Sequence, residues 1–393
     1  MKKIVFSLMA ITVLLLSSNM FFSSTLSETI SISSVTLTVD DDGPADYSCI
    51  QDAIDNASDD DTVFVYSGIY YENIIIDKSI NLMGEDKNTT IIDGQGIKAC
   101  LFFENSYIEL SNFKLKNLGQ YSGIYINSDN NNNVISNNIF IEDAGIAICS
   151  DSNYNQIIDN EFYNNDCTNI NIRSKNNYVS RNIIEDYDVG IEIWAPDNVI
   201  YNNIINSGKN GILIVSCGSD NEISQNIISN NSDHGIFSQM QFNIITNNLI
   251  ENNNIAIFLD YNMQSTISSN IIKGNNISLK TKEPYPEFEN LYANITKNNF
   301  INNNECKFHM YTNLINNNYW DDWIGLKNNE KHFLKTLINV FCKIVLPITN
   351  PMDFTGKIPY HVKGTPIQNK KYLNLDWNPA DEPFDIDTGW GVE

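Results

Sequence analysis

Apolar residues recur through the middle of the chain with a period near 22 residues. Seven anchors mark the repeat, spaced 23, 21, 21, 23, 22 and 22 residues apart: Ile135, Ile158, Val179, Ile200, Ile223, Ile245 and Ile267. Four positions after each anchor comes a second apolar residue: Ile139, Phe162, Ile183, Ile204, Ile227, Leu249 and Ile271. Apolar pairs two residues apart, such as Ile191 and Ile193, follow in most units and face one side of a strand. This pattern predicts a solenoid of β-strands rather than helices.

Asparagine recurs in the same register. It stands three positions after the anchor in six of the seven units, with Glu161 as the exception. It also stands two positions before the anchor in five units, with Gln156 and Ser265 in the other two. Equivalent residues of successive coils lie about 4.8 Å apart, so we expect these asparagines to pass amide hydrogen bonds along the stack as ladders.

Less regular apolar segments precede the repeat and predict further strands at residues 62–66, 74–76, 80–82 and 91–92. A short helix is predicted to open at Asp46, with one apolar face made by Ile50, Ala53, Ile54 and Ala57. Such a helix would cover the first coil, whose edge is otherwise unpaired.

The repeat weakens toward the C-terminus. A Pro-containing loop is predicted at Lys280–Leu291, the repeat resumes at Ile295–Phe300, and it fades at Leu314–Trp320. An apolar, helix-like stretch follows at His332–Val345. We therefore expect residues 35–323 to form an all-β, right-handed parallel β-helix with an N-terminal cap, and residues 324–393 to form an irregular segment that caps or wraps its last coils.

The N-terminus reads as an export signal. Lys2 and Lys3 precede an apolar run at Ile4–Leu16, which has the length of a secretory signal core. The apolarity continues to Phe22, so an uncleaved membrane anchor is the alternative. We assign residues 1–28 to a signal peptide or anchor and expect a secreted, cell-surface or periplasm-like location.

Composition narrows the partners. The chain has 24 Lys+Arg against 48 Asp+Glu, a net charge of -24, and only two arginines, Arg173 and Arg181. Phosphate backbones need clustered Lys and Arg, so nucleic acid is excluded as a partner. Anionic membrane surfaces are disfavoured for the same reason, which leaves an uncleaved N-terminal segment as the only membrane contact. The asparagine content, roughly 60 residues, is several-fold above ordinary usage and is explained by the ladders.

Several segments carry a family resemblance. The cap and first coil are represented by Val35–Asp46, Ile50–Ile54 and Val63–Asn73, followed by Ile80–Glu85 and Ile91–Gly94. Together they resemble secreted right-handed parallel β-helix proteins of the pectate-lyase superfamily, and most closely the NosD-like branch. That branch is named for periplasmic proteins of copper-centre maturation and includes many surface proteins. The resemblance implies the fold; it implies little about chemistry, because this fold carries lyases, hydrolases, adhesins and scaffolds.

The catalytic patterns of the superfamily are largely missing. Lyases of this fold combine a carboxylate calcium site with an Arg or Lys base, but neither Arg173 nor Arg181 lies beside an acidic cluster. One column of successive coils remains a catalytic candidate: Asp188, Lys209 and Asp233, with His234 adjacent. The two carboxylates would lie about 10 Å apart, near the separation found in inverting glycosidases. Solvated turn residues are the alternative interpretation.

Two segments could bind metal. Cys306, His309 and Met310 bring copper-type ligands within five residues, although strand alternation points Cys306 and Met310 toward burial instead. Asp40, Asp41 and Asp42 offer hard oxygen ligands for calcium, with a solvated cap turn as the alternative. Neither segment requires a cofactor, and we expect none.

Aromatic residues suit a carbohydrate partner. Outward candidates are Tyr125, Trp194 and Phe237, whose faces would complement the C–H faces of sugar rings. The leading hypothesis is an exported, non-catalytic β-helix that binds a polysaccharide or cell-envelope glycan, or serves as an envelope scaffold. The alternatives are a polysaccharide-active hydrolase or lyase with a groove on the helix face, and a NosD-like accessory protein for copper-centre maturation.

Overall fold

The computed structural model describes residues 34–96, 99–116, 123–142, 145–260, 264–281, 293–307, 314–321, 360–361, 375–376, 380 and 382–389. The chain divides into residues 1–34 and residues 35–393, and every described element belongs to the second unit. The predicted signal or anchor and the helix-like stretch at His332–Val345 lie outside the described residues. Among the described helices, none is long and apolar enough to cross a membrane.

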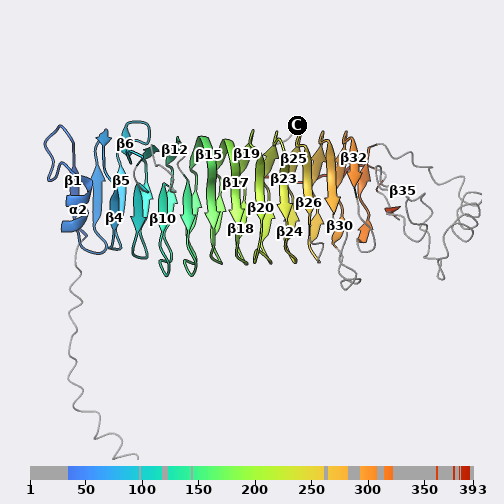
Figure 1. The fold of residues 1–393 in the computed structure, drawn as a ribbon, viewed down its shortest axis with the longest axis horizontal. Helices are drawn as coiled ribbons and strands as arrows, with labels where there is room; N and C mark the ends of the chain where they lie inside the picture. The colour runs from blue at the N-terminus through green and yellow to red at the C-terminus, as the bar shows by residue number, and fades with distance from the viewer. Residues whose placement is uncertain are drawn as a thin grey trace, which may run out of the picture. The chain divides into compact units, whose positions relative to one another are not determined.

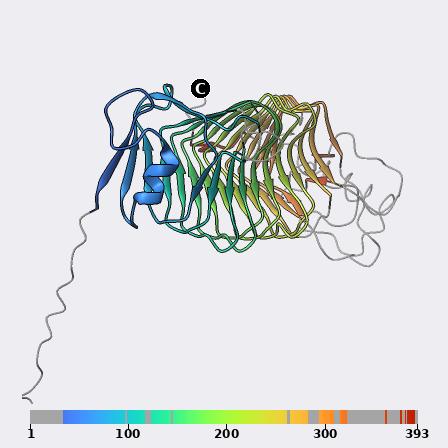
Figure 2. The same cartoon turned by 60° about the vertical axis from the view of Figure 1, so that its left-hand side comes forward.

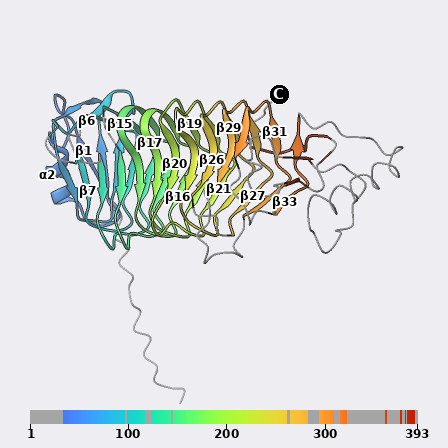
Figure 3. The same cartoon turned by 45° about the vertical axis from the view of Figure 1, so that its right-hand side comes forward.

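The described residues from Val35 to Asp321 form the predicted all-β, right-handed parallel β-helix, with about 12 coils at a spacing near 22 residues. Strands of successive coils lie side by side along one axis (Figure 1; Figure 3).

Each coil contributes to three faces. Face 1 is a 13-stranded parallel sheet. Its strands are β1 (Thr36–Val39), β2 (Thr62–Val65), β5 (Asn81–Gly84), β8 (Glu109–Ser111), β11 (Val134–Ser136), β14 (Gln156–Ile158), β16 (Tyr178–Ser180), β18 (Val199–Tyr201), β21 (Glu222–Ser224), β24 (Ile244–Thr246), β27 (Thr266–Ser268), β30 (Asn294–Thr296) and β33 (Leu314–Asn316).

Faces 2 and 3 are joined into one sheet because β15 (Glu161–Ile172) and β17 (Ile183–Ile193) run through both. The other strands of face 2 are β3 (Gly68–Tyr70), β6 (Thr90–Asp93), β9 (Lys114–Lys116), β12 (Ile139–Ile141), β19 (Ile204–Asn206), β22 (Ile227–Ser229), β25 (Leu249–Glu251), β28 (Ile271–Lys273), β31 (Asn299–Ile301) and β34 (Tyr319–Trp320). Those of face 3 are β4 (Ile74–Ile76), β7 (Leu101–Phe103), β10 (Ile124–Ile126), β13 (Ile146–Ile148), β20 (Asn210–Ile214), β23 (His234–Ser238), β26 (Ile255–Leu259), β29 (Ile277–Thr281) and β32 (Glu305–Lys307).

The core is a set of apolar columns inside the coils. On face 3, for example, Ile191 and Ile193 are fully buried and are in register with Ile212 and Ile214 of the next coil. Strand β29 extends to Thr281, so the predicted loop does not begin at Lys280, and the rest of its predicted range lies outside the described residues. A separate antiparallel pair is formed by β35 (Tyr360–His361) and β36 (Leu375–Asp376).

The predicted register was wrong by one residue in the second unit. Ile135 pairs with Ile157, and Ile157 pairs with Val179, so the anchor is Ile157 and not Ile158. Both residues are isoleucine, so the sequence alone does not distinguish the inward one, and a one-residue slip exchanges the two sides of a strand. In the corrected register, Asn155 and Asn160 occupy the two asparagine positions, and the exceptions at Gln156 and Glu161 disappear.

The corrected register also separates inner from outer residues on face 2. The inward column contains fully buried side chains five positions after the corrected anchors: Phe140, Phe162, Ile184, Ile205, Ile228, Ile250 and Ile272. The apolar residues four positions after the anchors point outward instead. They pair in register as Ile139, Glu161, Ile183, Ile204, Ile227, Leu249, Ile271 and Asn299, which we call the outer column of face 2.

Asparagine ladders stabilise the turns between faces. In the ladder between faces 1 and 2, the backbone and side-chain nitrogens of Asn226 both donate to Oδ1 of Asn248, at 2.9 and 3.0 Å. The same arrangement links neighbouring members of the series Asn138, Asn160, Asn182, Asn203, Asn226, Asn248, Asn270, Asn298 and Asn318. Each member follows a residue with left-handed backbone, such as Asn247 (φ 55°). Asparagine therefore serves both the turn conformation and the stack.

Two further ladders occupy the other turns. Asn133, Asn155, Asn177, Asn198, Asn221 and Asn243 form one between faces 3 and 1, and Asn231, Asn253, Asn275 and Asn303 form one between faces 2 and 3. The predicted stacking of asparagines is thus present at all three turns.

The helix α2 (Ile50–Asn56) buries Ile50, Ala53 and Ile54 and lies beside the first coils (Figure 2). It begins at Ile50 and not at Asp46, whose carboxylate instead accepts hydrogen bonds from Thr38. The Glu72 carboxylate accepts hydrogen bonds from the backbone amides of Ile50 and Gln51, at 2.8 and 2.9 Å. A side chain from the next coil therefore caps the helix, since Cys49 at the N-cap makes no side-chain bond.

Candidate functional site

The outer side of face 3 carries a column of outward side chains that includes aromatic rings and polar groups. Strand pairing places them in register at successive coils: Ile75, Phe102, Tyr125, Ala147, Asn171, Glu192, Leu213, Phe237, Phe258 and Lys280. We call this the outer column of face 3. Its members lie about one strand spacing, 4.8 Å, apart, so the column offers a row of contacts parallel to the solenoid axis.

Aromatic rings gather at two places in this column. Phe102 and Tyr125 lie 6.1 Å apart between ring centroids. Farther along, Phe237 and Phe258 make an edge contact at 5.2 Å, and the Lys280 ammonium lies 4.3 Å above the Phe258 ring. Half-buried rings of this kind present both an apolar surface and a nearby donor.

Between the aromatic groups lies a polar network. Asn171 donates to Glu192 at 2.7 Å and accepts from the Nε of Arg173 at 3.1 Å. The Arg173 guanidinium also lies over the Trp194 ring, 5.8 Å from its centroid. Of the predicted outward aromatics, Tyr125 and Trp194 are indeed exposed, and Phe237 is half-buried. The network holds amide and carboxylate oxygens beside an exposed ring.

In the predicted catalytic column, Asp188 lies within β17, whereas Lys209 and Asp233 lie just before β20 and β23. Asp188, Lys209 and Asp233 immediately precede the paired residues Val189, Asn210 and His234 of successive coils. The Lys209 ammonium lies 3.2 Å from the Asp188 carboxylate, and about half of each side chain is exposed. An ion pair this exposed contributes at most about 1 kcal/mol. The Asp188–Lys209 pair is solvated, and a catalytic role for these residues stays a prediction.

His234 differs from its neighbours because it is packed against aromatic rings. Its ring stacks on Phe258 at 5.6 Å, and its Nδ1 lies 3.0 Å from the Asn210 side-chain oxygen and 3.3 Å from Asp233. Burial lowers the pKa of His234 below its ordinary value of 6.5, with Lys280 acting in the same direction and Asp233 opposing. The imidazole is therefore mainly neutral at pH 7.

Asp40, Asp41 and Asp42 bring one carboxylate oxygen each within 4.8 Å of the others. Asp41 and Asp42 are exposed, and Asp40 accepts a hydrogen bond from the Asp42 backbone amide. Among the described residues this is the single group of three such ligands, and its oxygens suit a hard cation such as calcium rather than copper. Calcium binding here stays a prediction.

The copper-type ligands are only partly described. The Cys306 thiol is buried, donates to the Leu279 carbonyl, and has its pKa raised to about 12 by burial. A thiol held in this way is a poor metal ligand, because metal binding needs the thiolate. His309 and Met310 lie outside the described residues. The six described cysteines are all free thiols.

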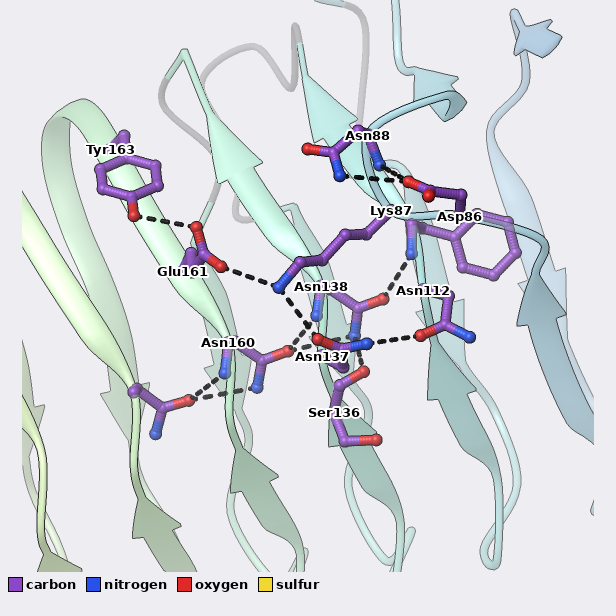
Figure 4. Close-up of polar contacts among 12 residues, drawn as sticks. Asp86, Lys87, Asn88, Asn112, Ser136, Asn137, Asn138, Asn160, Glu161 and Tyr163 are labelled. Atoms are coloured by element: carbon purple, nitrogen blue, oxygen red, sulfur yellow. Dashed lines mark hydrogen bonds and ion pairs between the residues drawn. The ribbon is translucent and has the colours of Figure 1, made fainter. Parts of the chain in front are cut away.

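One polar cluster was missed from the sequence. Lys87 reaches across the outer side of face 2, where its ammonium lies 2.7 Å from Glu161 and 2.9 Å from the Asn137 side-chain oxygen (Figure 4). Tyr163 donates to the same carboxylate at 2.8 Å. Although burial opposes it, the hydrogen bonds from Lys87 and Tyr163 lower the pKa of Glu161, and burial with that carboxylate raises the pKa of Tyr163 to about 12. The signal was Glu161 itself, a charged residue in an apolar outer column.

Comparison with known proteins agrees with this architecture. Residues 168–331 match the family described as "NosD: Periplasmic copper-binding protein (NosD)". No curated protein sequence matches the chain.

Solved structures share the fold at low identity. The A-module of mannuronan C-5 epimerase AlgE6 from Azotobacter vinelandii has a TM-score of 0.59 and 17% identity, with 68% of this chain and 87% of that chain covered. PfbA, a surface adhesin of Streptococcus pneumoniae, has a TM-score of 0.53 and 14% identity, with 70% and 89% covered. A tailspike protein of E. coli bacteriophage HK620, solved with a hexasaccharide, has a TM-score of 0.50 and 11% identity, with 66% and 59% covered. The resemblance to NosD-like right-handed parallel β-helix proteins is therefore confirmed, by sequence over residues 168–331 and by fold over the solenoid.

Proposed function

We propose that this protein is an exported β-helix that binds a largely uncharged polysaccharide, without turnover, along the outer column of face 3. The observation that carries this proposal is the in-register row itself, in which four aromatic rings, one amide and one carboxylate stand at strand spacing. Aromatic faces accept the C–H faces of sugars, and amide and carboxylate groups pair with hydroxyls.

Charge supports an uncharged ligand. The chain carries a net charge of -24, which repels polyuronates and other acidic glycans. On face 3 itself, Glu192 is balanced by Arg173 through Asn171, and Lys280 is positioned over Phe258. The outer side of face 3 therefore offers hydrogen-bond donors and acceptors, and its positive and negative side chains partly cancel each other's charge.

The contacts of the candidate catalytic column support binding without turnover. The Asp188 carboxylate forms an exposed ion pair with Lys209, and the Asp233 carboxylate faces His234. A general acid and a general base must both be directed at a bound substrate, and these contacts occupy the two carboxylates instead.

The comparisons support a carbohydrate-related role. AlgE6 is an epimerase of mannuronan, the HK620 tailspike was solved with a hexasaccharide, and PfbA is a surface adhesin. The NosD description names a periplasmic protein, which fits the exported location expected from residues 1–28.

The test is binding to immobilised glycans followed by calorimetry with the best ligand. Replacing Phe237 and Phe258 together by Ala should weaken binding at least tenfold, since each stacked ring contributes about 1 kcal/mol beyond its buried area. The matched control is Tyr178→Ala with Tyr201→Ala, because these rings stack at 6.4 Å on the outer side of face 1. Equal loss in both double variants would overturn the assignment to face 3.

Turnover assays separate the second candidate, a polysaccharide-active enzyme, which the Asp188–Lys209–Asp233 column favours. Reducing ends or unsaturated products that disappear in Asp188→Asn and Asp233→Asn would establish it.

A copper-maturation role is tested by metal analysis of protein purified without added copper. Stoichiometric copper would favour the copper-maturation role over glycan binding, because the outer column of face 3 offers no set of ligands suited to copper.

A further inference from the structure

The outer column of face 2 is apolar yet well shielded over its C-terminal coils. Ile204, Ile227, Leu249 and Ile271 point outward in successive coils, where β-strand side chains normally meet water. Leu249, at the centre of the four, is nevertheless only 4% exposed. Its burial requires further atoms on the outer side of these strands.

The C-terminal residues 382–389, which we call the strap, lie at both ends of this stretch. At one end, the Asn299 side chain holds the strap backbone with two bonds: its Nδ2 donates to the Phe384 carbonyl at 2.7 Å, and its Oδ1 accepts from the Phe384 amide at 2.8 Å. Just before the strap, the Ala380 amide donates to the Asn318 carbonyl at 2.8 Å.

At the other end, Gly389 closely approaches two amide side chains. A β-carbon built on Gly389 would lie 3.0 Å from Gln225 Oε1 and 3.4 Å from Asn202 Oδ1. Asn202 Oδ1 is buried and has no hydrogen-bond partner among the described residues, although Asn202 lies in a turn on the outside of the solenoid. The strap thus runs from the coil of Asn299 back toward the coils of Gln225 and Asn202.

Chain length agrees with this path. Five extended residues from Phe384 to Gly389 span about 17 Å. Three to four strand spacings separate the coil of Asn299 from those of Gln225 and Asn202, or about 14–19 Å. The strap therefore crosses the strands of face 2 in extended form.

Alternate strap residues face the solenoid. Phe384 and Ile386 are half-buried and Thr388 is 1% exposed, whereas Asp385 and Asp387 between them are exposed. This two-residue period is that of an extended segment with one apolar side. It matches the apolar outer column beneath it.

We propose that the outer side of face 2, from Ile204 to Asn299, is a binding surface for an extended peptide, and that the strap is its intramolecular ligand. Recognition combines the two-bond Asn299 clamp on the main chain with apolar side chains at alternate positions. Because these contacts depend on the segment and not on its covalent connection, the surface binds the same segment when it is supplied as a separate peptide.

The experiment uses the full-length chain with Phe384→Asp and Ile386→Asp, which release the strap. A labelled synthetic peptide with the sequence of residues 380–389 should bind this variant saturably, and should bind wild-type protein at least tenfold more weakly because the site is occupied. The matched control, Glu382→Ala with Asp385→Ala, changes only exposed strap residues and should behave as wild type. A peptide carrying Ser at both apolar positions should not bind.

A released variant that keeps its β-sheet circular dichroism but fails to bind the peptide would overturn the proposal. If the released variant does not fold, the proposal is tested instead by hydrogen exchange, measured on the wild-type chain and on Asn299→Ala. Asn299→Ala should raise exchange of the Phe384 amide at least tenfold, and an unchanged rate would show that the clamp does not hold the strap.

Discussion

At the scale of single residues, Tyr187 and Gly208 show how one ladder is continued without asparagine. They occupy the positions that precede Asn231 in the ladder between faces 2 and 3. The Tyr187 ring fills the space beside Gly208, where a β-carbon would lie 2.0 Å from a ring carbon. Its hydroxyl then donates to Oδ1 of Asn231, two coils away. Gly208 is needed for space and not for backbone conformation, since the left-handed residue of that turn is Ser207 (φ 62°).

Replacing Gly208 by Asn should therefore destabilise the protein by about 1–3 kcal/mol through overpacking against Tyr187. The double variant Tyr187→Asn, Gly208→Asn rebuilds an asparagine ladder, so it should recover part of the combined loss. Urea unfolding of the four proteins in this cycle gives the coupling energy, which we expect to exceed about 1 kcal/mol. Additive effects would refute the compensation.

His234 should make stability depend on pH. Its folded-state pKa lies below 6.5, so the unfolded chain binds more protons as the pH falls past that value, and stability decreases with falling pH. His234→Gln removes this term. As the pH falls from 8 to 5, the free energy of unfolding should therefore decrease less for the variant than for wild type, as measured by urea titration. Parallel pH curves would contradict the assignment.

At the scale of elements, the turn ladders hold adjacent coils together. Asn248 donates to the carbonyl oxygens of Ile223 and Thr246 and accepts both bonds from Asn226. A truncated side chain would leave several fully buried groups without partners, at about 1–3 kcal/mol each. The turns are thus as important to coil stacking as the apolar columns.

Asn248→Ala should lower stability by about 3 kcal/mol or more, and native-state hydrogen exchange should localise the loss to the neighbouring coils. The control is Asn247→Gly, one residue earlier, which removes a half-buried side chain outside the ladder but keeps the left-handed turn (φ 55°). It should change stability by a few tenths of a kcal/mol. Comparable losses at both sites would mean that the ladder bonds contribute little.

At the scale of the whole solenoid, each coil contacts chiefly its two neighbours. Residue 134 is equivalent to residue 156, so deletion of residues 134–155 removes one complete coil and joins matching positions. Solenoids tolerate such changes because their stability is close to a sum over units and interfaces.

We expect this 22-residue deletion to retain the β-sheet circular dichroism spectrum and a cooperative thermal transition. Deletion of residues 134–144, which removes half a coil, should abolish folding because it places outward residues in the core. If both deletions were equally damaging, coils would not be the independent units of this fold.

The sequence by itself determined the coil length, the all-β class, the apolar columns and the asparagine ladders. In a solenoid, residues one period apart in sequence become neighbours in space. The positions that repeat in the sequence are therefore also positions that contact each other in the structure. Two aromatic residues of the outer column of face 3, Tyr125 and Phe237, could be predicted in the same way, whereas Phe102 and Phe258 were not.

Only the tertiary structure decided which of two adjacent isoleucines faces the core at Ile157, because either choice satisfies the pattern. It also decided the contacts that do not follow the period: Glu72 on α2, Lys87 on Glu161, Tyr187 on Asn231, and the strap on Asn299. None of these contacts joins equivalent positions of adjacent coils. They are selected by packing and hydrogen bonding in the folded chain, and the periodic pattern marks only Glu161, a charged residue in an apolar outer column.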